Sequence, residues 1–401
     1  MSVKKSVNAL EYCKNSSGCL LRNGQLFMAF TCEKISGDHP YGVKFSTYSD
    51  AIKRYIVCND NAVYVSETVW NFKDVCAFNC EFPPFMVEKW GERDAEAVII
   101  SGSYAVVLSG GSADKLNLGA SLSCGVMHCG RLFGADAYDG LVLRWSGADA
   151  ITDWTAELHG SGFLKLDPER GEIIDMLIFN GKIVAVREHG LTVLSMYGSP
   201  ENFSVELTDT DCDTIFRNTA KITNGKLYFY SVSGLKCFDG NKISIIELNH
   251  SLSKVNGCAV YGNKYFLCGA SETAGTDVIM YVDLANGENC VIKEYAENVF
   301  ASDAVYCSAG GVLHELKDGG GYYFFESDPI DFGTGRLKTI TKIDVQGTVN
   351  IRISNGKYKR GFNNASGVIR PHMRGKSFII ELDGASSLKG LTVTAEVTDA
   401  V

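Results

Sequence analysis

Short apolar runs separated by glycine turns characterise residues 127–203. A run reaches a tight turn such as Cys129-Gly130 or Asn180-Gly181, a second run follows, and another glycine turn leads to a third. Asn-Gly and related pairs adopt the positive φ values that a two-residue antiparallel hairpin requires. Three or four such strands in succession form a meander. A meander that recurs along the chain predicts the blades of a β-propeller.

The same turn pattern recurs along most of the chain. Successive turns are separated by 37, 41, 28, 51, 44, 37 and 41 residues, mostly near the roughly 40 to 50 residues of a four-stranded blade. The interval of 28 indicates that one turn is not equivalent to the others. We therefore predict about seven blades, within a range of six to eight. The turns of the series lie at Gly24, Asn61, Gly102, Gly130, Gly181, Gly225, Gly262 and Asp303.

The apolar runs are nearly continuous, as in AVII, DMLIF, CAVY and VIMYV. A strand that is covered on both faces has this pattern, and blades packed side by side cover each other's faces. Aromatic residues make up 11% of the chain and Pro is scarce, which also favours strands joined by glycine turns. One helix is predicted at residues 88–97, although Gly91 weakens it.

The pattern changes after Gly319-Gly320-Gly321. Apolar and polar residues now alternate, as at Ile343, Val345, Ile351 and Ile353. Clean alternation predicts antiparallel strands with one face in water, here a small antiparallel β-sandwich. The charge changes at the same point, since residues 327–401 carry 11 Lys and Arg against 7 Asp and Glu, and residues 1–326 carry 27 against 40. We predict an all-β chain with a propeller at 1–326 and the sandwich at 327–401.

Composition limits the partners. The formal net charge of −9 argues against general nucleic-acid binding. No apolar stretch approaches the roughly 18 residues of a membrane helix, and the N-terminus lacks the apolar region of a secretory signal. We therefore expect a chain without a signal peptide. The 14 cysteines then belong to a reducing compartment, mostly as small buried apolar residues.

Three aspartates alternate in the segment LTDTDCDT, at Asp209, Asp211 and Asp213. An EF-hand loop would need Gly at the position of Thr214 and Glu at the position of Ala220, so that match fails. A polar loop between strands is the favoured interpretation, and a calcium site of another kind stays open.

Two groups of thiols and imidazoles invite comparison with zinc sites. Cys76 and Cys80 form one, and Cys124, His128 and Cys129 form the other. Their spacings fit the paired C-x₂-C pattern poorly, and in a strand Cys129 faces away from Cys124 and His128. We predict no metal site.

The segment WSGADAITDW resembles the Asp-box turn of sialidases in Ser146, Asp149 and Trp154. The Gly that such a turn requires is missing, and only one copy is present. We expect Trp145 and Trp154 to pack between blades. A sialidase also needs arginines that bind a carboxylate, and four arginines are candidates to converge at a propeller centre. They are Arg131, Arg144, Arg187 and Arg217.

Other catalytic patterns are missing. The sequence contains no H-E-x-x-H pair, no G-x-S-x-G elbow and no P-loop. A basic run near the C-terminus could meet phosphate, but a solvated strand face is its simplest interpretation. We therefore predict a protein that is not an enzyme, with no catalytic, cofactor-binding or metal-binding residues. The basic run comprises Lys357, Lys359, Arg360, Arg370 and Arg374.

Several segments together resemble bacteriophage and prophage structural proteins of the tail or head-tail connector. The first set is Arg131 to Gly134, the Arg144-Trp145-Ser146 triplet, the Asp153-Trp154 turn and FNGKIVAVREHGLTVLSMYGSPENF, similar to blades of phage β-propeller proteins. The second set resembles a small β-sandwich that some of these proteins carry after the propeller. It comprises DFG at 331–333, LKTI at 337–340, RGKSF at 374–378 and the final LKGLTVTAEVT.

The resemblance implies a structural subunit that binds other virion proteins or copies of itself and passes from the bacterial cytoplasm into the virion. Its acidic propeller and basic C-terminal part would offer opposite charges to neighbours, unless both are simply solvated surfaces. Two alternatives remain. One is a glycan-binding or glycan-cleaving propeller with a central pocket, and the other is a cytosolic interaction scaffold.

Overall fold

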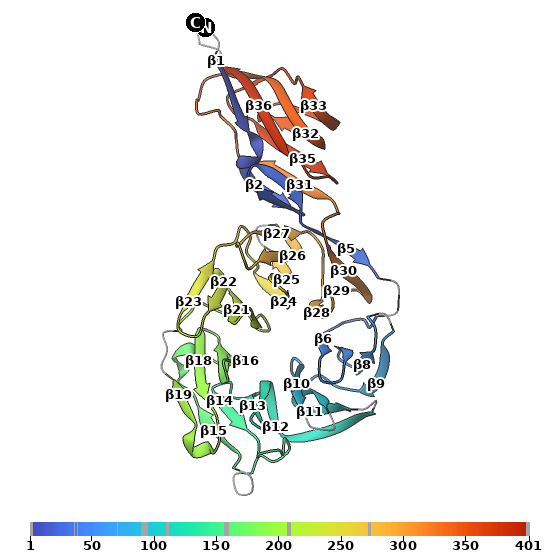
Figure 1. Cartoon of the computed structure of the whole chain (residues 1–401), viewed down its shortest axis with the longest axis vertical. Helices are drawn as coiled ribbons and strands as arrows, with labels where there is room; N and C mark the ends of the chain where they lie inside the picture. Colours follow the sequence, from blue (N-terminus) through green and yellow to red (C-terminus); the bar gives the residue numbers. More distant parts are fainter. Residues whose placement is uncertain are drawn as a thin grey trace. The chain divides into compact units, whose positions relative to one another are not determined.

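The computed structural model describes residues 3–397, apart from 36, 38, 70, 90–94, 110–111, 156–159, 207–209 and 272–273. The described chain is nearly all β, as predicted (Figure 1). Its helical segments are three short 3-10 turns, η1 (Ala9–Glu11), η2 (Pro168–Arg170) and η3 (Pro200–Asn202). None of the described helices is long and apolar enough to span a membrane.

The chain forms two compact units. The first comprises residues 1–33, 288–293 and 316–401, and the second comprises residues 34–287 and 294–315. We call the second the propeller unit, because it contains most of the propeller strands, although β27 (Asn289–Ile292), most of β5 (Phe30–Lys34) and the end of β30 (Val312–Asp318) are grouped with the first. We call the first the terminal unit, because it contains both ends of the chain.

Five antiparallel four-stranded sheets and one six-stranded sheet of described strands build the propeller, within the predicted range of six to eight blades (Figure 1). The four-stranded sheets are β6 (Phe45–Ser49), β7 (Arg54–Cys58), β8 (Ala62–Ser66), β9 (Lys73–Ala77); β16 (Ile173–Phe179), β17 (Lys182–Arg187), β18 (Gly190–Ser195), β19 (Ser204–Glu206); β20 (Lys221–Thr223), β21 (Lys226–Ser231), β22 (Gly234–Phe238), β23 (Ile243–Ile246); β24 (Lys254–Tyr261), β25 (Lys264–Ser271), β26 (Thr276–Asp283), β27 (Asn289–Ile292); and β28 (Asn298–Ala301), β29 (Val305–Ala309), β30 (Val312–Asp318), β5 (Phe30–Lys34).

The six-stranded sheet contributes two inner strands to the ring. Its strands are β10 (Phe85–Lys89), β11 (Glu96–Ser109), β12 (Ser112–His128), β13 (Arg131–Asp136), β14 (Val142–Trp145) and β15 (Gly162–Lys165). The first part of β12 pairs with β11, and after a register shift near Gly119 its second part pairs with β13. Both β10 and this second part of β12 face the centre. Seven inner strands therefore surround the axis, although the described sheets number six.

The tight turns have the predicted conformation. Asn180 and Gly181 have φ values of 51° and 75°, and Asn224 and Gly225 have 51° and 68°. Two turns of the predicted series are not blade turns. Gly24 joins a hairpin of the terminal unit, and Gly102 lies inside β11 at a register shift, which explains the short interval of 28 residues.

The prediction of a helix at residues 88–97 is wrong, because both of its end residues lie in strands. Glu88 belongs to β10 and pairs with Ala97 of β11, and residues 90–94 lie outside the described part of the chain. Cross-strand pairing and burial outweigh the helical propensity of these residues, as tertiary context commonly does.

Apolar clusters fill the spaces between neighbouring sheets. One cluster joins Ile183 and Leu194 of one sheet to Phe133 and Leu143 of the six-stranded sheet. Equivalent clusters join β7 and β8 to β11, and β17 and β18 to β21 and β22. Because each sheet is covered on both faces, its central strands, such as β7, β17 and β18, are buried at nearly every position, as the continuous runs predict.

The ring closes between the first and last sheets. Tyr55 of β7 is buried against Phe300, Tyr306 and Leu313, which come from three strands near the other end of the propeller. Tyr55 and Tyr306 each donate a hydrogen bond to Asp303 Oδ1, over 2.8 and 3.0 Å. Closure therefore combines apolar packing with one carboxylate that accepts bonds from both sides.

The terminal unit contains one continuous eight-stranded sheet. The strand order is β1-β36-β32-β35-β31-β2, and β33 and β34 also pair with β32. Together with the hairpin β3-β4 these strands enclose one apolar core. The strands are β1 (Val3–Asn8), β2 (Cys13–Ser17), β3 (Cys19–Arg22), β4 (Gln25–Met28), β31 (Tyr323–Ser327), β32 (Lys338–Ser354), β33 (Lys359–Ile369), β34 (Met373–Gly375), β35 (Ile379–Gly384) and β36 (Gly390–Val397).

Two features of the terminal unit differ from the prediction. Its strands form one hydrogen-bonded sheet, so a sandwich of two stacked sheets is not confirmed. The predicted boundary between residues 326 and 327 also leaves the N-terminal strands out of this unit. In the structure β1 pairs with β36 and β2 pairs with β31. N-terminal strands thus lie at both ends of the path from β1 to β2, in a sheet whose other strands follow Gly321. The predicted alternation is confirmed, since Ile343, Val345, Ile351 and Ile353 are all buried.

The closure of the ring gives a stability prediction. Asp303→Ala should lower the free energy of unfolding by about 1–2 kcal/mol, because the Tyr55 and Tyr306 hydroxyls lose a charged acceptor. Urea denaturation at neutral pH measures the change. Asp74→Ala, at an exposed position of β9, is the control and should have little effect. Equal stability of the two variants would contradict a role for Asp303 in closure.

Candidate functional site

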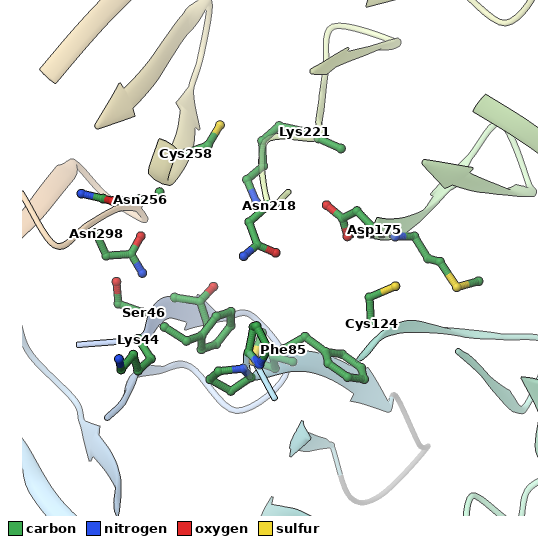
Figure 2. Close-up of a pocket in the computed structure, with 18 of the residues that line it drawn as sticks. Lys44, Ser46, Phe85, Cys124, Asp175, Asn218, Lys221, Asn256, Cys258 and Asn298 are labelled. Atoms are coloured by element: carbon green, nitrogen blue, oxygen red, sulfur yellow. Dashed lines mark hydrogen bonds between the residues drawn. The ribbon is translucent and has the colours of Figure 1, made fainter. Parts of the chain in front are cut away.

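A cavity of about 250 Å³ lies at the centre of the propeller (Figure 2). Every inner strand of the ring contributes to its wall, so residues far apart in the sequence meet there. The lining residues fall into short segments from β6, β10, β12, β16, the start of β20, β24 and β28. Concave sites with a few convergent polar groups are the usual places for small ligands, and this cavity has that form.

Register shifts position the side chains of two inner strands. Ser123 is the extra residue between the paired positions Leu122 and Cys124, and Asn256 is the extra residue between Val255 and Gly257. Bulges of this kind redirect a side chain away from the regular alternation. Both extra residues line the cavity.

Close approach of inner strands requires glycine at one position of the wall. A Cβ atom on Gly257 would lie 2.1 Å from Asn298 Oδ1 and 2.9 Å from the Val299 nitrogen. Because Gly257 has no side chain, β24 and β28 can approach closely. This approach brings Asn256 and Asn298 to the same part of the wall.

The polar wall is rich in amides and contains one carboxylate. Asn256 donates from Nδ2 to the Ala296 carbonyl over 3.0 Å, so its amide is held by the protein. Asn298 accepts from the Val299 N–H over 2.8 Å, and Figure 2 shows its amide directed into the cavity. Asn218 has a φ of 60° and also extends inward. The charged lining residues are Lys44, Asp175 and Lys221.

Burial raises the pKa of Asp175 above the ordinary value, because protein surrounds the carboxyl where β16 meets the centre. Lys221, the Met176 N–H and Arg217 oppose this effect without cancelling it. The Met176 N–H donates to Asp175 Oδ1 over 2.8 Å. Lys44 is exposed and pairs with Asp60 at 3.4 Å, so its charge is already compensated.

Two thiols of the wall are protonated at neutral pH. Burial raises the pKa of Cys124 to about 12 and that of Cys258 to about 11. The thiolate is the nucleophilic form of cysteine, so neither side chain is poised for covalent chemistry. Asp175 is the single carboxylate among the described lining residues, whereas glycoside hydrolysis generally uses two. The cavity is therefore suited to hydrogen bonding.

The structure separates Cys124 from His128 and Cys129, whereas Cys129 Sγ lies 3.4 Å from His128 Nε2, so the prediction that these two face apart is wrong. Cys124 lines the central cavity, while His128 and Cys129 line a second cavity of about 220 Å³ with Glu88 and Asp149. Cys80 donates from Sγ to the Asn59 carbonyl. Among the described residues, no three His, Cys, Asp or Glu side chains are grouped so that they could hold a metal ion.

The calcium candidate has other partners where it is described. Asp211 pairs with Arg170 at 2.7 Å, and Asp213 accepts from the Ser233 N–H and lies 3.4 Å from Lys236. Asp209 lies outside the described residues. The favoured polar loop is consistent with these contacts.

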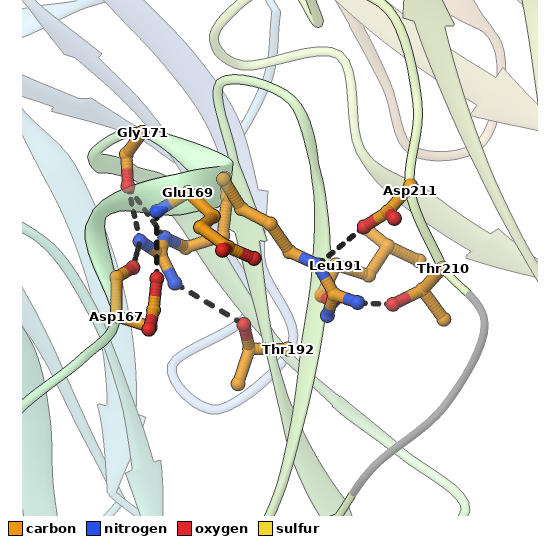
Figure 3. Close-up of polar contacts among 9 residues, drawn as sticks. Asp167, Glu169, Gly171, Leu191, Thr192, Thr210 and Asp211 are labelled. Carbon is orange, nitrogen blue, oxygen red and sulfur yellow. Dashed lines mark hydrogen bonds and ion pairs between the residues drawn. The ribbon is translucent and has the colours of Figure 1, made fainter.

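The four candidate arginines do not converge as a group. Arg187 is buried and donates to the carbonyls of Asp167 and Gly171 and to Thr192 Oγ1, which fixes the turn η2 to β17 and β18 (Figure 3). Arg131 donates to the carbonyls of Ser146 and Gly160.

The other two arginines have carboxylate partners, and these lie outside the cavity. Arg144 pairs with Asp136 at 2.5 Å, and Arg217 lies 3.9 Å from Glu172. None of the four lines the central cavity, so they form no carboxylate-binding cluster there.

The expected packing between blades is confirmed for Trp145, whereas the cluster beside Trp154 lies within the six-stranded sheet. Trp145 is buried in the cluster between the six-stranded sheet and β16–β18, and its Nε1 donates to the Gly160 carbonyl over 3.0 Å. Trp154 packs against the cluster between β10, β11, β12 and β13. Ser146 accepts from the Leu132 N–H, so this segment serves the fold.

The sequence did not single out the residues of the central wall. Asp175 opens the run DMLIF, where a lone carboxylate precedes continuous apolar residues, and that contrast is the one available signal. Asn218, Asn256 and Asn298 lie in unrelated contexts, and only ring closure brings them together.

No protein-family profile and no curated protein matches the chain. Among solved structures, streptogramin B lyase aligns with a TM-score of 0.51 at 11% identity, over 73% of this chain and 98% of that one. PorZ, a surface component of the type-IX secretion system of Porphyromonas gingivalis, aligns with a TM-score of 0.45 at 11% identity, over 82% and 46%. BamB from Moraxella catarrhalis gives 0.38 at 13% identity, over 72% and 98%.

At these identities the likeness concerns the fold alone. Together with the ring of sheets, the lyase alignment shows that the chain is a β-propeller protein.

The carboxylate of Asp175 gives a second prediction. Asp175→Asn should raise the free energy of unfolding at pH 7, because the amide carries no charge and still accepts from the Met176 N–H. The folded-state pKa is raised, so the gain should be full above that pKa and vanish below about pH 3.9, where the carboxyl is neutral in both states.

Urea denaturation at several pH values measures this difference. Asp239→Asn is the control, because the N–H groups of Asn241 and Lys242 hold the pKa of the exposed Asp239 below its ordinary value. That variant should show no gain at pH 7. A loss of stability in Asp175→Asn at pH 7 would mean that attraction to Lys221 outweighs burial.

Proposed function

We propose that the chain is a non-enzymatic structural subunit of a phage or prophage particle, in the tail or head-tail connector, and that it works through protein-protein contacts. The resemblance of the segments around Trp145 and of the C-terminal segments to such proteins supports the proposal. A propeller combined with a C-terminal β unit is the arrangement that the resemblance implies.

An open strand edge carries the proposal. Strand β33 is 11 residues long and pairs on one side with β32, while no described strand pairs with its other side. Most of its residues are exposed. Long free edges are sites where another chain can add a strand, and proteins usually shorten or cover them. This edge is therefore a candidate contact surface.

Cations surround this edge. Arg370 and Arg374 are exposed, and neither forms an ion pair with a described carboxylate. Lys357 lies 5.3 Å from the Tyr358 ring, also without a described carboxylate partner. Lys359 pairs with Glu381 at 2.8 Å, so part of the basic run is compensated internally. The uncompensated cations favour an acidic partner.

The propeller unit has the complementary charge. It carries 21 Lys and Arg against 35 Asp and Glu, a net charge of −14, while the terminal unit carries 17 against 12, a net charge of +5. A terminal unit of one copy and a propeller of the next would therefore attract each other. Such head-to-tail contacts generate rings or filaments, the forms that a particle axis requires.

The glycan-cleaving and scaffold alternatives have less support. Glycan cleavage generally uses two carboxylates, and the described wall of the central cavity has one. A cytosolic scaffold predicts a monomer with an exposed apolar patch on one rim. The first test is the neighbourhood of the gene. Portal, terminase, capsid or tail genes beside it would support the particle role, and carbohydrate-uptake or glycosidase genes would overturn it.

The charge contrast gives a third prediction. The purified protein should self-associate at about 0.05 M salt and dissociate at about 0.5 M, because salt screens attraction between exposed charges. The double variant Arg370→Glu/Arg374→Glu should stay monomeric at both salt concentrations. Sedimentation velocity measures the oligomeric state.

A charge-matched control distinguishes an effect of this surface on self-association from an effect of the total charge of the protein. Lys115→Glu/Lys226→Glu changes the same total charge at exposed positions of the propeller and should still associate at low salt. A wild-type protein that is monomeric at low salt would rule out self-association through β33. Loss of association in both double variants would assign it to net charge alone.

A further inference from the structure

An unpartnered hydroxyl lies in the wall of the central cavity. Ser46 is 7% exposed, and its Oγ has no hydrogen-bond partner among the described residues. Buried polar groups are nearly always paired, and an unpaired one is costly. Ser46 lines the cavity, so a bound molecule there could supply the missing partner.

Amide groups lie near this hydroxyl. Figure 2 shows Asn298 extending toward the same region as Ser46, with Asn218 reaching inward from the neighbouring part of the wall. Asn298 uses Oδ1 to accept from the Val299 N–H, and its Nδ2 donates to no described residue. The wall therefore offers a hydroxyl and free amide donors together, which can bind groups that both donate and accept.

The opposite part of the wall carries one charge of each sign. Asp175 accepts a single bond from the Met176 N–H, which leaves carboxylate oxygen available to the cavity. Lys221 also lines the cavity, and it forms no ion pair with a described carboxylate. Since these two charges offset each other and Lys44 pairs with Asp60, a neutral ligand would leave no uncompensated charge.

We propose that the central cavity binds a small neutral polyhydroxylated molecule of about monosaccharide size. Hydroxyl groups both donate and accept, so they match Ser46, the amides of Asn298 and Asn218, and the Asp175 carboxylate. Apolar side chains including Phe45, Phe85 and Met176 line the remaining wall and can contact the C–H faces of a sugar. This inference does not depend on the particle role.

The volume sets the size of the ligand. At about 250 Å³ the cavity lies just below the roughly 300–1,000 Å³ of pockets for drug-sized molecules. One sugar ring is therefore the expected occupant. A longer glycan would place its other rings outside the cavity.

The test is binding of galactose, mannose and N-acetylglucosamine to the full chain, measured by saturation-transfer NMR and titration calorimetry. We expect saturable binding of at least one sugar. Ser46→Ala and Asp175→Asn should each raise its Kd by about tenfold, because each removes an interaction with a bound hydroxyl.

Matched controls separate the cavity from general effects. Ser308→Ala also removes a buried hydroxyl that lacks a described partner, but Ser308 does not line the cavity. Asp239→Asn removes a carboxylate from an exposed turn. Both controls should bind the sugar with unchanged Kd. Circular dichroism shows whether each variant is folded, and two independent cavity variants keep the test valid if one of them unfolds.

Three results would overturn the proposal. The first is no saturable binding of any of the three sugars by the folded wild-type protein. The second is an unchanged Kd in both cavity variants, which would place the sugar elsewhere. The third is displacement of the sugar by glycine betaine or inorganic phosphate at lower concentration than by a second sugar, which would assign the cavity to a charged ligand. None of these results bears on self-association through β33.

Discussion

Apolar packing between the faces of neighbouring sheets is the interaction on which the propeller depends. Each sheet has two apolar faces, and no sheet can cover both by itself. The clusters that contain Ile183, Ile99 and Phe229 each join residues of two neighbouring sheets. All faces are covered only when the last sheet packs against the first sheet. This contact forms where Tyr55 packs against Phe300. Closure is thus required by burial, and the Asp303 hydrogen bonds add to it.

The same convergence determines the character of the centre. Inner strands approach so closely that Gly257 has no room for a side chain, and register shifts turn Ser123 and Asn256 into the axis. At the centre a small cavity remains, lined by amides, one described carboxylate and the ammonium groups of Lys44 and Lys221. Its described polar groups can donate and accept hydrogen bonds, and burial keeps the thiols of Cys124 and Cys258 protonated at neutral pH. The surface that we propose for large partners and the site that we propose for a small ligand therefore belong to different parts of the chain.

Local sequence patterns predicted the architecture, because tight turns and runs of apolar residues can be recognised in short segments. Asn180-Gly181 and Asn224-Gly225 need positive φ, and the structure has it at all four residues. The same reasoning misassigned Gly24 and Gly102, since a glycine turn looks alike in a blade, a hairpin and a bulge. Pairing of β1 with β36 joins residues almost 400 positions apart, which no local pattern reveals. The central site was missed for this reason too. Asn218 and Asn298 line the same cavity only because the ring closes. Arg187, a candidate from the sequence, instead donates to the carbonyl of Gly171 in a neighbouring turn.

Strand β12 has a consequence for how the propeller unfolds. Most neighbouring sheets are joined by loops, so one of them could detach while the next stays hydrogen-bonded. β12 instead runs without a break from its pairing with β11 into its pairing with β13. Loss of either pairing frees the end of a strand that the other pairing still holds. The described strands β10 to β15 should therefore exchange their amide protons as one cooperative unit, larger than any other described sheet of the ring.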